Sequence, residues 1–329
     1  MQGIGPGRLV IVAGPTATGK TQAAIALAGR LNAEIVCADS RTVYRGLDTG
    51  TAKPTLRDRA TVPHHLLDVA DPGEPFTLAD YQRLALEAID GIHDRGRIAI
   101  LTGGTGLYIR AVVDRIAVPA AAPDWDLRER LAVEERRGGP GTLHRRLHEI
   151  DPAAAARIHP RNVRRVIRAL EVYEATGRTI SAFQAEVRGG RWAAGREEGE
   201  VRMVALTVDR ERLYERLDRR IDAQLAAGLV EEVRTLLRAG YDRSFPALQG
   251  LGYKEIAEHL EGEASLEAAV AEFRRNSRRY AKRQWTWFRA DPRYRWIDAG
   301  DEPPERVASR IVDAPHASIP SNDSAGSVL

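Results

Sequence analysis

The sequence predicts an α/β fold, in which a P-loop core with a parallel sheet is flanked by helices and carries a helical insertion domain. Three observations predict this fold. A glycine-rich octapeptide, residues 14–21, lies directly between an apolar strand-like run and an apolar helical run. Two further strand-like runs end in polar or glycine-rich loops, as parallel strands do where ligands gather at their carboxyl ends. Residues 119–200 are strongly charged and contain no strand-like run, and strand character resumes only at residue 201.

The octapeptide has the composition and spacing of a loop that holds a polyphosphate. Its glycines allow the backbone to turn N–H groups toward phosphate oxygens, the Lys20 ammonium adds a positive charge, and the Thr21 hydroxyl can bind Mg²⁺. The following helix adds the partial positive charge of its N-terminus. The alternative is a surface turn rich in glycine and threonine, and the loop alone does not distinguish a diphosphate from a triphosphate. The residues expected to hold the phosphates are Gly14, Pro15, Thr16, Ala17, Thr18, Gly19, Lys20 and Thr21.

Strands and helices alternate along the first part of the chain. The P-loop follows a strand at residues 9–13, and a second buried strand at residues 34–38 is followed by Asp39. Thr77 and Asp80 form a capping-box pattern that begins a helix running to about residue 93. A third strand, residues 98–101, ends in a glycine-rich loop. This order predicts a parallel sheet with its ligands along one edge.

The second half of the chain predicts a discontinuous core domain. Residues 201–208 form a strand, Asp209 begins a helix to about residue 225, and a further helix runs to residue 238. We therefore expect residues 1–118 and 201–313 to form the P-loop core and residues 119–200 to form an inserted helical domain. Residues 314–329, rich in Ser, Pro, Asn and Gly, are expected to be a disordered tail.

The composition is that of a globular protein, because 43% of the 329 residues are apolar and 29% are charged. No apolar run approaches the roughly 20 residues that cross a bilayer, and the N-terminus lacks the features of a signal peptide. A single cysteine, Cys37, excludes an internal disulfide and a multi-cysteine metal site. We expect a soluble, cytoplasmic monomer with no membrane partner.

The net charge is only +3, but basic residues are concentrated in two stripes along the sequence. Residues 272–295 hold nine basic and two acidic side chains, and the pairs within residues 274–283 are spaced by four. Arg161, Arg164, Arg165 and Arg168 share one face of another helix. Either stripe alone could be a solvated face, whereas two together favour contact with a phosphate backbone. The tryptophans after residue 283 fit a core better than a platform for nucleobases.

Asp39 is the carboxylate in the most reactive position, because it ends the strand that follows the P-loop unit. It could act as a general base, hold Mg²⁺ as a Walker-B acid does, or cap the turn that follows, and we favour the general base. The strand at residues 98–101 is followed by Thr102 and two glycines, so it offers no acid where an NTPase would hold its metal.

Arg216 and Arg220 lie four residues apart on the helix that Asp209 begins, so they share a face. They could clamp a leaving pyrophosphate through charge-assisted hydrogen bonds. The alternative is a solvated amphipathic helix on which Glu215 and Asp218 pair with the arginines.

Eight segments, in order, resemble the bacterial tRNA dimethylallyltransferases, also called tRNA isopentenyltransferases. They are residues 14–21 (GPTATGKT), 39–46 (DSRTVYRG), 50–54 (GTAKP), 64–68 (HHLLD), 103–108 (GGTGLY), 168–172 (RALEV), 251–255 (LGYKE) and 280–284 (YAKRQ). The resemblance covers about residues 8–300 and is far more specific than a P-loop alone.

The resemblance implies transfer of a dimethylallyl group from dimethylallyl diphosphate to N6 of adenosine 37 in tRNAs that read codons beginning with U. The products would be N6-dimethylallyladenosine and pyrophosphate, and the implied cofactor is Mg²⁺, with Thr21 as its ligand. The implied catalytic residues are Asp39 as the base, Thr105 in the channel where base and allyl group meet, and Arg216 on the diphosphate. Arg220 is a candidate helper at the diphosphate.

The resemblance also implies that the inserted domain grips the anticodon stem-loop of a tRNA. The chain departs from the family pattern at Arg41 and Thr42, where the family has Met and Gln. A hydroxyl thus replaces a glutamine amide, and we expect this to affect recognition of the bases beside the target and not the chemistry. The implied tRNA-binding residues are Asp39, Ser40, Arg41, Thr42, Thr105, Arg128, Arg164, Arg165, Arg168, Gln249, Gly252 and Tyr253.

The residues alone leave two other functions open. A small-molecule P-loop enzyme, either a kinase or an adenylate isopentenyltransferase, would use Asp39 on a hydroxyl or amine and would not need the arginine stripes. A nucleotide-dependent RNA-binding switch would need to recognise a base, and the sequence lacks the Asn/Thr-Lys-x-Asp pattern for guanine. The ordered motifs favour the tRNA enzyme.

Overall fold

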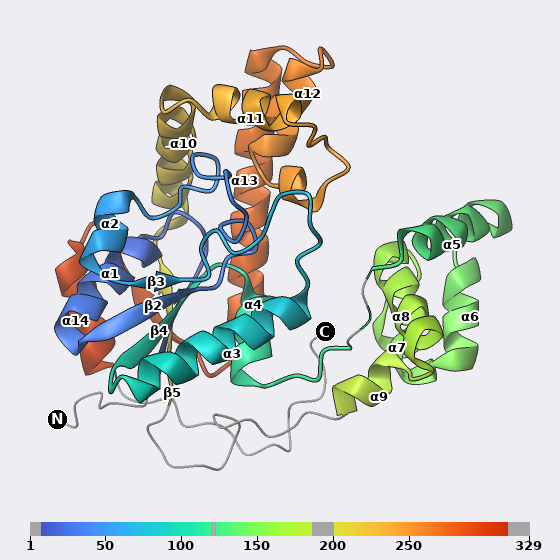
Figure 1. Cartoon of the computed structure of the whole chain (residues 1–329), viewed down its shortest axis with the longest axis horizontal. Helices are drawn as coiled ribbons and strands as arrows, with labels where there is room; N and C mark the ends of the chain where they lie inside the picture. Colours follow the sequence, from blue (N-terminus) through green and yellow to red (C-terminus); the bar gives the residue numbers. More distant parts are fainter. Residues whose placement is uncertain (1–7, 120, 122, 186–200, 315–329) are drawn as a thin grey trace.

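The core of the protein is a six-stranded parallel sheet (Figure 1). A computed structural model describes residues 8–119, 121, 123–185 and 201–314 of the chain. The strand order is β3-β2-β4-β1-β5-β6, so the P-loop follows a central strand, β1. The strands are β1 (Leu9–Ala13), β2 (Ala33–Cys37), β3 (His64–His65), β4 (Ile98–Gly103), β5 (Val201–Thr207) and β6 (Arg295–Asp298).

The four strands expected from the sequence are confirmed, with ends that differ by no more than two residues. The parallel pairing that they were expected to form is confirmed as well. The sequence did not predict β3 and β6, which form the two edges of the sheet. Runs of two and four residues carry too little periodicity to indicate a strand.

Helices cover both faces of the sheet, and strand residues alternate between the two faces. Val10 and Val12 of β1 belong to the core beneath α1 and α14, whereas Leu9 and Ile11 belong to the core beneath α3 and α4. With both faces covered, ligands can approach at the carboxyl ends of the strands. The covering helices are α1 (Lys20–Leu31), α3 (Leu78–Asp94), α4 (Gly106–Val113) and α14 (Pro304–Asp313).

A helical lobe stands over the carboxyl ends of the strands (Figure 1). The loop between β2 and β3 contributes Val43, Tyr44 and Leu47 to the core of this lobe, where they meet Tyr253 and Phe273. The helices that were expected to end near residues 225 and 238 are confirmed and belong to this lobe. Its elements are α10 (Arg210–Ala226), α11 (Leu229–Arg238), the 3₁₀ turn η1 (Pro246–Gln249), α12 (Tyr253–Leu260) and α13 (Leu266–Arg289), whereas α2 (Leu56–Thr61) lies beside α1 (Figure 1).

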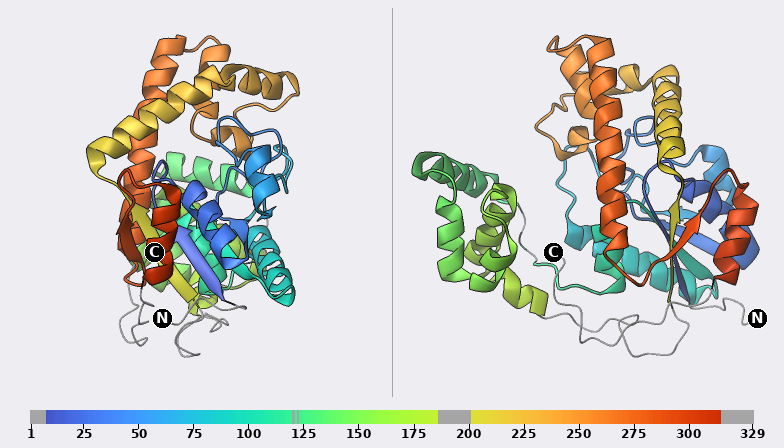
Figure 2. Two further views of the ribbon diagram at one scale, coloured as in Figure 1. Left: turned by 90° about the vertical axis from the view of Figure 1, so that its left-hand side faces the viewer. Right: turned by 180° about the vertical axis from the view of Figure 1, so that it is seen from behind.

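Five helices between residues 125 and 185 form a separate body beside the core (Figures 1 and 2). This body has its own apolar cluster, to which Leu131, Leu147 and Leu170 contribute. No strand occurs within residues 123–185, as the sequence predicted. The linker at residues 189–200 and the tail beyond residue 314 lie outside the described residues. The five helices are α5 (Trp125–Gly138), α6 (Thr142–Ile150), α7 (Pro152–Arg157), α8 (Val163–Thr176) and α9 (Ile180–Ala185).

Candidate active site

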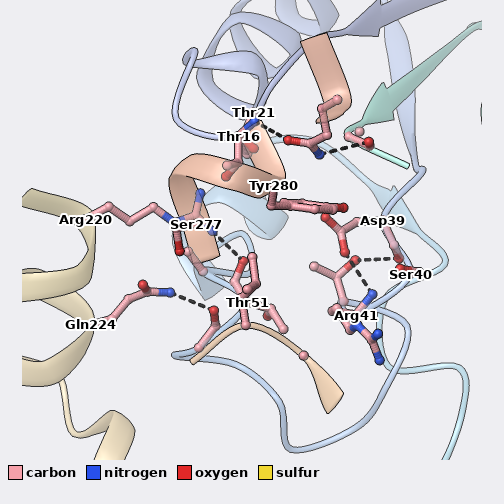
Figure 3. A pocket seen from close by; sticks show the side chains of 18 of the residues that line it. Thr16, Thr21, Asp39, Ser40, Arg41, Thr51, Arg220, Gln224, Ser277 and Tyr280 are labelled. Atoms are coloured by element: carbon pink, nitrogen blue, oxygen red, sulfur yellow. Dashed lines mark hydrogen bonds between the residues drawn. The ribbon is translucent and has the colours of Figure 1, made fainter. Parts of the chain in front are cut away.

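A pocket lies where the carboxyl edge of the sheet meets the helical lobe (Figure 3). Its walls come from segments far apart in the sequence: the P-loop, the loop after β2, the segment at residues 50–54, the end of β4, and helices α10 and α13. The residues predicted from the sequence that line it are Thr16, Lys20, Thr21, Asp39, Ser40, Arg41, Thr42, Arg220, Gln249 and Tyr253.

The P-loop has the conformation that its glycines were expected to permit. Gly14 has a φ of 136°, and a Cβ there would collide with the carbonyl oxygen of Leu206. Gly19 has a φ of 85° and directly precedes α1. The Thr18 hydroxyl and the Lys20 ammonium both donate to the Pro15 carbonyl oxygen, at 2.9 and 2.6 Å. The loop is therefore held in shape by its own hydrogen bonds, with the first turn of α1 facing the pocket.

Two of the cations that line the pocket, Lys20 and Arg220, are desolvated and have no carboxylate in salt-bridge contact within the described residues. Burial, reinforced by the charge of Arg220, lowers the pKa of Lys20 to about 7, although Asp39 acts in the opposite direction. Burial also lowers the pKa of Arg220, and Asp39 again opposes the shift. Arg220 donates one hydrogen bond, to the Thr51 carbonyl oxygen at 2.9 Å. Two desolvated cations that repel each other form a site that an anion would stabilise.

The structure does not bring Arg216 into the pocket. Its guanidinium donates to the Gly300 carbonyl oxygen and lies 3.3 Å from Asp301, on the turn between β6 and α14. Arg220 lies one helical turn further along α10 and is the arginine that lines the pocket. Both arginines lie on the same face of α10, but only the turn that carries Arg220 lies over the P-loop.

Asp39 lies two residues after the end of β2 and is held by the backbone of its own loop. Its Oδ1 accepts a hydrogen bond from the Arg41 N–H at 2.8 Å, so the turn-capping interpretation is correct for one oxygen. The carboxylate also lines the pocket, where the Tyr280 ring points toward it (Figure 3). The Thr105 hydroxyl accepts a hydrogen bond from the Ser40 N–H at 3.1 Å and also bonds Tyr280. Burial, followed by the charge of Asp39, raises the pKa of Tyr280 to about 12, so its phenol is protonated at neutral pH.

The segment at residues 48–51 is fastened to the helical lobe by one carboxylate. Glu232 accepts hydrogen bonds from the N–H groups of Thr49 at 2.7 Å and Gly50 at 3.2 Å, and from the Tyr253 hydroxyl at 2.5 Å. Gln224 donates to the carbonyl oxygens of Thr49 and Gly50 at 2.9 and 2.7 Å. A Cβ on Gly50 would collide with the Tyr253 ring. The pocket wall formed by this segment is thus fixed by side chains of α10, α11 and α12.

Several loop residues that were expected to contact tRNA are engaged with other parts of the protein. Thr42 is only 7% exposed but lines the pocket, and its hydroxyl lies 3.5 Å from the Asp39 carbonyl oxygen. Arg41 reaches across the pocket mouth and donates to the Pro246 carbonyl oxygen. The Gln249 amide donates to the Arg243 carbonyl oxygen. Gly252 precedes α12 with a φ of 85°, against the Phe273 ring, and its role is to shape the wall.

Four arginines of the inserted domain were predicted to contact tRNA, and they form two pairs with different surroundings. Arg128 and Arg168 both bind the buried carboxylate of Glu171, at distances of 2.6 to 2.9 Å. Arg128 thereby joins α5 to α8, whereas Arg168 binds Glu171 within α8 and also donates to the Ala121 carbonyl oxygen. Arg164 and Arg165 are exposed and have no ion pair within the described residues. They are the pair free to meet an external phosphate.

The second basic stripe, on α13, is only partly available to a ligand. Arg274 and Arg278 bind Asp218 of α10, at 3.4 and 2.6 Å, so they join two helices of the lobe. Arg283 lines the pocket. Trp285 is 37% exposed and lies beneath the Arg289 guanidinium, so it is not a fully buried core residue.

The polar pocket residues that sequence reasoning missed include Gln224, Tyr280 and Gln284. Tyr280 and Gln284 lie in the motif at residues 280–284, and their spacing of four places them on one helix face. Gln224 follows Arg220 by the same spacing. That periodicity was the available signal, although it does not by itself say which face meets a ligand.

Comparison with known proteins identifies the family. A sequence model of the family described as IPP transferase matches residues 42–291. The tRNA dimethylallyltransferase of Symbiobacterium thermophilum is 48% identical over 305 residues, which cover 92% of this chain and 93% of the relative. The chain belongs to the tRNA dimethylallyltransferase family.

Solved structures of this family have the same fold. The tRNA isopentenylpyrophosphate transferase of Bacillus halodurans is 42% identical, with a TM-score of 0.68 over 93% of this chain and 94% of that one. A eukaryotic dimethylallyltransferase acting on tRNA is 27% identical, with a TM-score of 0.72 over 89% of this chain and 74% of that one. None of the helices in the described ranges has the length and apolar character needed to cross a bilayer.

Proposed function

We propose that this tRNA-prenylating enzyme uses dimethylallyl diphosphate to modify N6 of adenosine 37 in tRNAs that read codons beginning with U. The products are N6-dimethylallyladenosine and pyrophosphate. The observation that carries the proposal is a pocket that combines two desolvated cations, Lys20 and Arg220, with an oriented carboxylate, Asp39. The cations suit a departing pyrophosphate, and the carboxylate suits a proton released by the attacking amine.

Departure of the diphosphate is the step in which negative charge develops. The bond between C1 of the allyl group and the diphosphate oxygen breaks, and its electron pair leaves with pyrophosphate. Lys20, Arg220 and the N–H groups at the start of α1 would receive that charge in a desolvated site, where electrostatic stabilisation is strongest.

Mg²⁺ would neutralise part of the diphosphate charge when bound. Within the described ranges, no three His, Cys, Asp or Glu side chains form a metal-binding group. This composition fits a Mg²⁺ that takes most of its oxygen ligands from phosphate and water. The Thr21 hydroxyl, next to Lys20 in the pocket wall, would be the protein ligand.

The new bond forms between C1 and the N6 nitrogen, which loses a proton as it gains the carbon. Asp39 would accept this proton, because its carboxylate is held in place by the Arg41 N–H and faces the pocket. Tyr280 stays protonated and can donate a hydrogen bond near the reacting groups. Thr105, which bonds both Tyr280 and the Ser40 N–H, would position this end of the pocket.

The target adenine would leave its stack and enter the mouth of the pocket beside Arg41 and Gln249. The anticodon stem-loop would then lie between the core and the inserted domain, where Arg164 and Arg165 contact its phosphates. We further propose that the enzyme acts as a cytoplasmic monomer.

The decisive experiment incubates the purified protein and Mg²⁺ with labelled dimethylallyl diphosphate and an unmodified tRNA that carries adenosine at position 37. We expect label in this tRNA and none in a matched tRNA with guanosine at position 37. Two further reactions test the alternatives. One replaces the tRNA with free adenosine monophosphate, which a small-molecule prenyltransferase would label, and the other supplies ATP and small acceptors, which a kinase would phosphorylate. Label in the mononucleotide alone, or phosphoryl transfer without prenyl transfer, would refute the proposal.

A further inference from the structure

Arg283 is an exposed arginine of α13 that lines the pocket. It follows Tyr280 by three residues, so the two share one face of the helix, and its guanidinium carbon lies 5.7 Å from the centroid of the Tyr280 ring. Arg274, Arg275 and Arg278 of the same helix each form a salt bridge with a carboxylate. Arg283 forms none with any carboxylate in the described parts of the chain, so its charge at the rim of the pocket is not neutralised there.

The guanidinium of Arg283 lies at the end of the pocket that holds Asp39. Burial, followed by the charge of Asp39, raises the pKa of the Tyr280 phenol. The charges of Arg41 and Arg283 oppose that rise, so both guanidinium groups lie near the same phenol. Figure 3 shows Asp39 and Arg41 on one side of the pocket and Arg220 on the other. The pocket therefore has positive charge at two separate places, one beside the P-loop and one beside Asp39.

The proposed reaction brings two kinds of phosphate to this pocket. The diphosphate of the donor suits the desolvated cations, Lys20 and Arg220. A nucleotide whose base has left its stack stays joined to the RNA by a phosphodiester on each side, and these phosphates remain at the protein surface. An exposed arginine beside Asp39 suits such a phosphodiester, because a guanidinium can donate to two phosphate oxygens at once.

We propose that Arg283 binds a backbone phosphate of the nucleotide whose adenine enters the pocket. The inference rests on the proposed function, because it takes a tRNA as the acceptor. A contact with this phosphate fixes how far the base enters, so that the N6 nitrogen stops beside Asp39. This role differs from that of Arg164 and Arg165, which contact the stem-loop from the inserted domain.

A neutral linkage beside adenosine 37 tests the contact. A fluorescent anticodon stem-loop is prepared with a methylphosphonate on the 5′ or the 3′ side of this nucleotide, and its binding to the full chain is measured by anisotropy. For the wild-type protein, we expect one of the two neutral linkages to weaken binding by at least about threefold. That linkage should also lower the slope of log Kd against log salt by about 0.7.

Arg283→Ala should weaken binding of the unmodified stem-loop by at least about threefold. It should then bind the modified and unmodified stem-loops equally, because the side chain that senses the phosphate charge is gone. Arg283→Lys keeps the charge and should retain part of the preference for the charged linkage.

Arg279→Ala is the matched control, because it removes the same charge from the preceding turn of α13. Arg279 is exposed, and it is not among the residues that line the pocket. Whatever its overall affinity, this variant should lose as much affinity as the wild-type protein when the linkage beside adenosine 37 is made neutral.

An equal loss of affinity on neutralising the linkage in the wild-type protein and in Arg283→Ala would overturn the inference. So would wild-type binding that is insensitive to both neutral linkages, or no binding of the stem-loop at all. Weaker binding of magnesium pyrophosphate by Arg283→Ala, with the sensitivity to the linkage unchanged, would assign Arg283 to the donor diphosphate instead.

The binding measurement contains no prenyl donor, so its outcome is separate from that of the transfer assay. The expected pattern in a protein that fails to prenylate tRNA would support the role of Arg283 and reject the proposed reaction. Prenyl transfer to tRNA without that pattern would support the reaction and reject the role of Arg283.

Discussion

Arg220, and not Arg216, supplies the second cation of the pocket, although both arginines lie on one face of α10. We expect Arg220→Ala to weaken pyrophosphate binding by at least about tenfold, because a charge-assisted hydrogen bond in a desolvated site is removed. Arg216→Ala, the matched control, should change the Kd by less than about threefold, since that side chain binds Gly300 and Asp301. Isothermal titration with magnesium pyrophosphate distinguishes the two. A larger loss of pyrophosphate affinity in Arg216→Ala than in Arg220→Ala would show that Arg216 is the arginine that binds the diphosphate.

Asp39 is expected to act in the chemical step and not in binding. Asp39→Asn keeps the size of the side chain and an oxygen for the Arg41 N–H, but it removes the base. Single-turnover prenyl transfer should slow by about 100-fold or more, the usual effect of losing a general base. The affinities for tRNA and pyrophosphate should stay within about threefold of wild type. A normal rate would exclude Asp39 as the base, and weakened affinity with an unchanged rate would make it a binding residue.

The sequence could place Asp39 and the P-loop because each lies next to the strand that positions it. It could not separate Arg216 from Arg220, since the choice depends on how α10 is set over the sheet. The position of Gln284 in the pocket could not be predicted from the sequence, for a related reason. It meets Thr16 across 268 positions of sequence, and no local pattern encodes that contact.

At the scale of single elements, β2 contains a charged residue inside the sheet. The apolar pattern of this strand does not explain that residue. Glu34 is buried, and its carboxylate binds Arg95 at 2.7 Å, Arg97 at 3.1 Å and His65 at 2.7 Å. Burial alone would raise the pKa of Glu34, but the hydrogen bonds from Arg95 and His65 outweigh it and lower the pKa to about 2. The cluster ties β2 to β3 and to the end of α3, which explains how an edge strand of two residues is held.

This cluster predicts a specific loss of stability in acid. In the unfolded chain, Glu34 takes up a proton near its ordinary pKa of 4.5, whereas in the folded protein it stays ionised down to about 2. Its contribution to the free energy of unfolding is therefore complete above about pH 4.5 and disappears as the pH falls toward about 2. Glu34→Gln should be less stable than wild type in urea at neutral pH, and the difference should shrink over this interval.

Glu87→Gln is the control for the acid experiment, because Glu87 is 60% exposed and forms an exposed pair with Arg83 across one helical turn. Its stability should follow that of the wild-type protein at every pH. A constant difference between wild type and Glu34→Gln from neutral pH to about pH 2 would show that the carboxylate is not the titrating group.

At the scale of the whole molecule, the chain combines a pocket for small-molecule chemistry with a separate helical body. The change in composition at residue 119 was enough to predict the insertion, because charge and helical periodicity are local properties. The lobe formed by α10 to α13 was not predicted, since its helices have the same amphipathic pattern as helices that flank a sheet. The pocket is completed only where this lobe meets the sheet.

If the inserted body holds RNA, Arg164 and Arg165 on α8 should determine how binding depends on salt. α8 lies on the side of this body that faces the core, and α6 lies on the far side (Figures 1 and 2). We expect Arg164→Ala with Arg165→Ala to weaken tRNA binding. The slope of log Kd against log salt should fall by about 0.7 to 0.9 for each tRNA phosphate that the protein no longer neutralises.

Arg130→Ala with Arg137→Ala is the control, because it removes the same charge from the groove between α5 and α6. Its salt slope should match that of the wild-type protein, since the proposed phosphate contacts lie on α8. If the α8 pair leaves the slope unchanged, Arg164 and Arg165 form a solvated face and the RNA is held elsewhere. If both pairs reduce the slope equally, the inserted body attracts RNA by its overall charge and has no defined contact surface on α8.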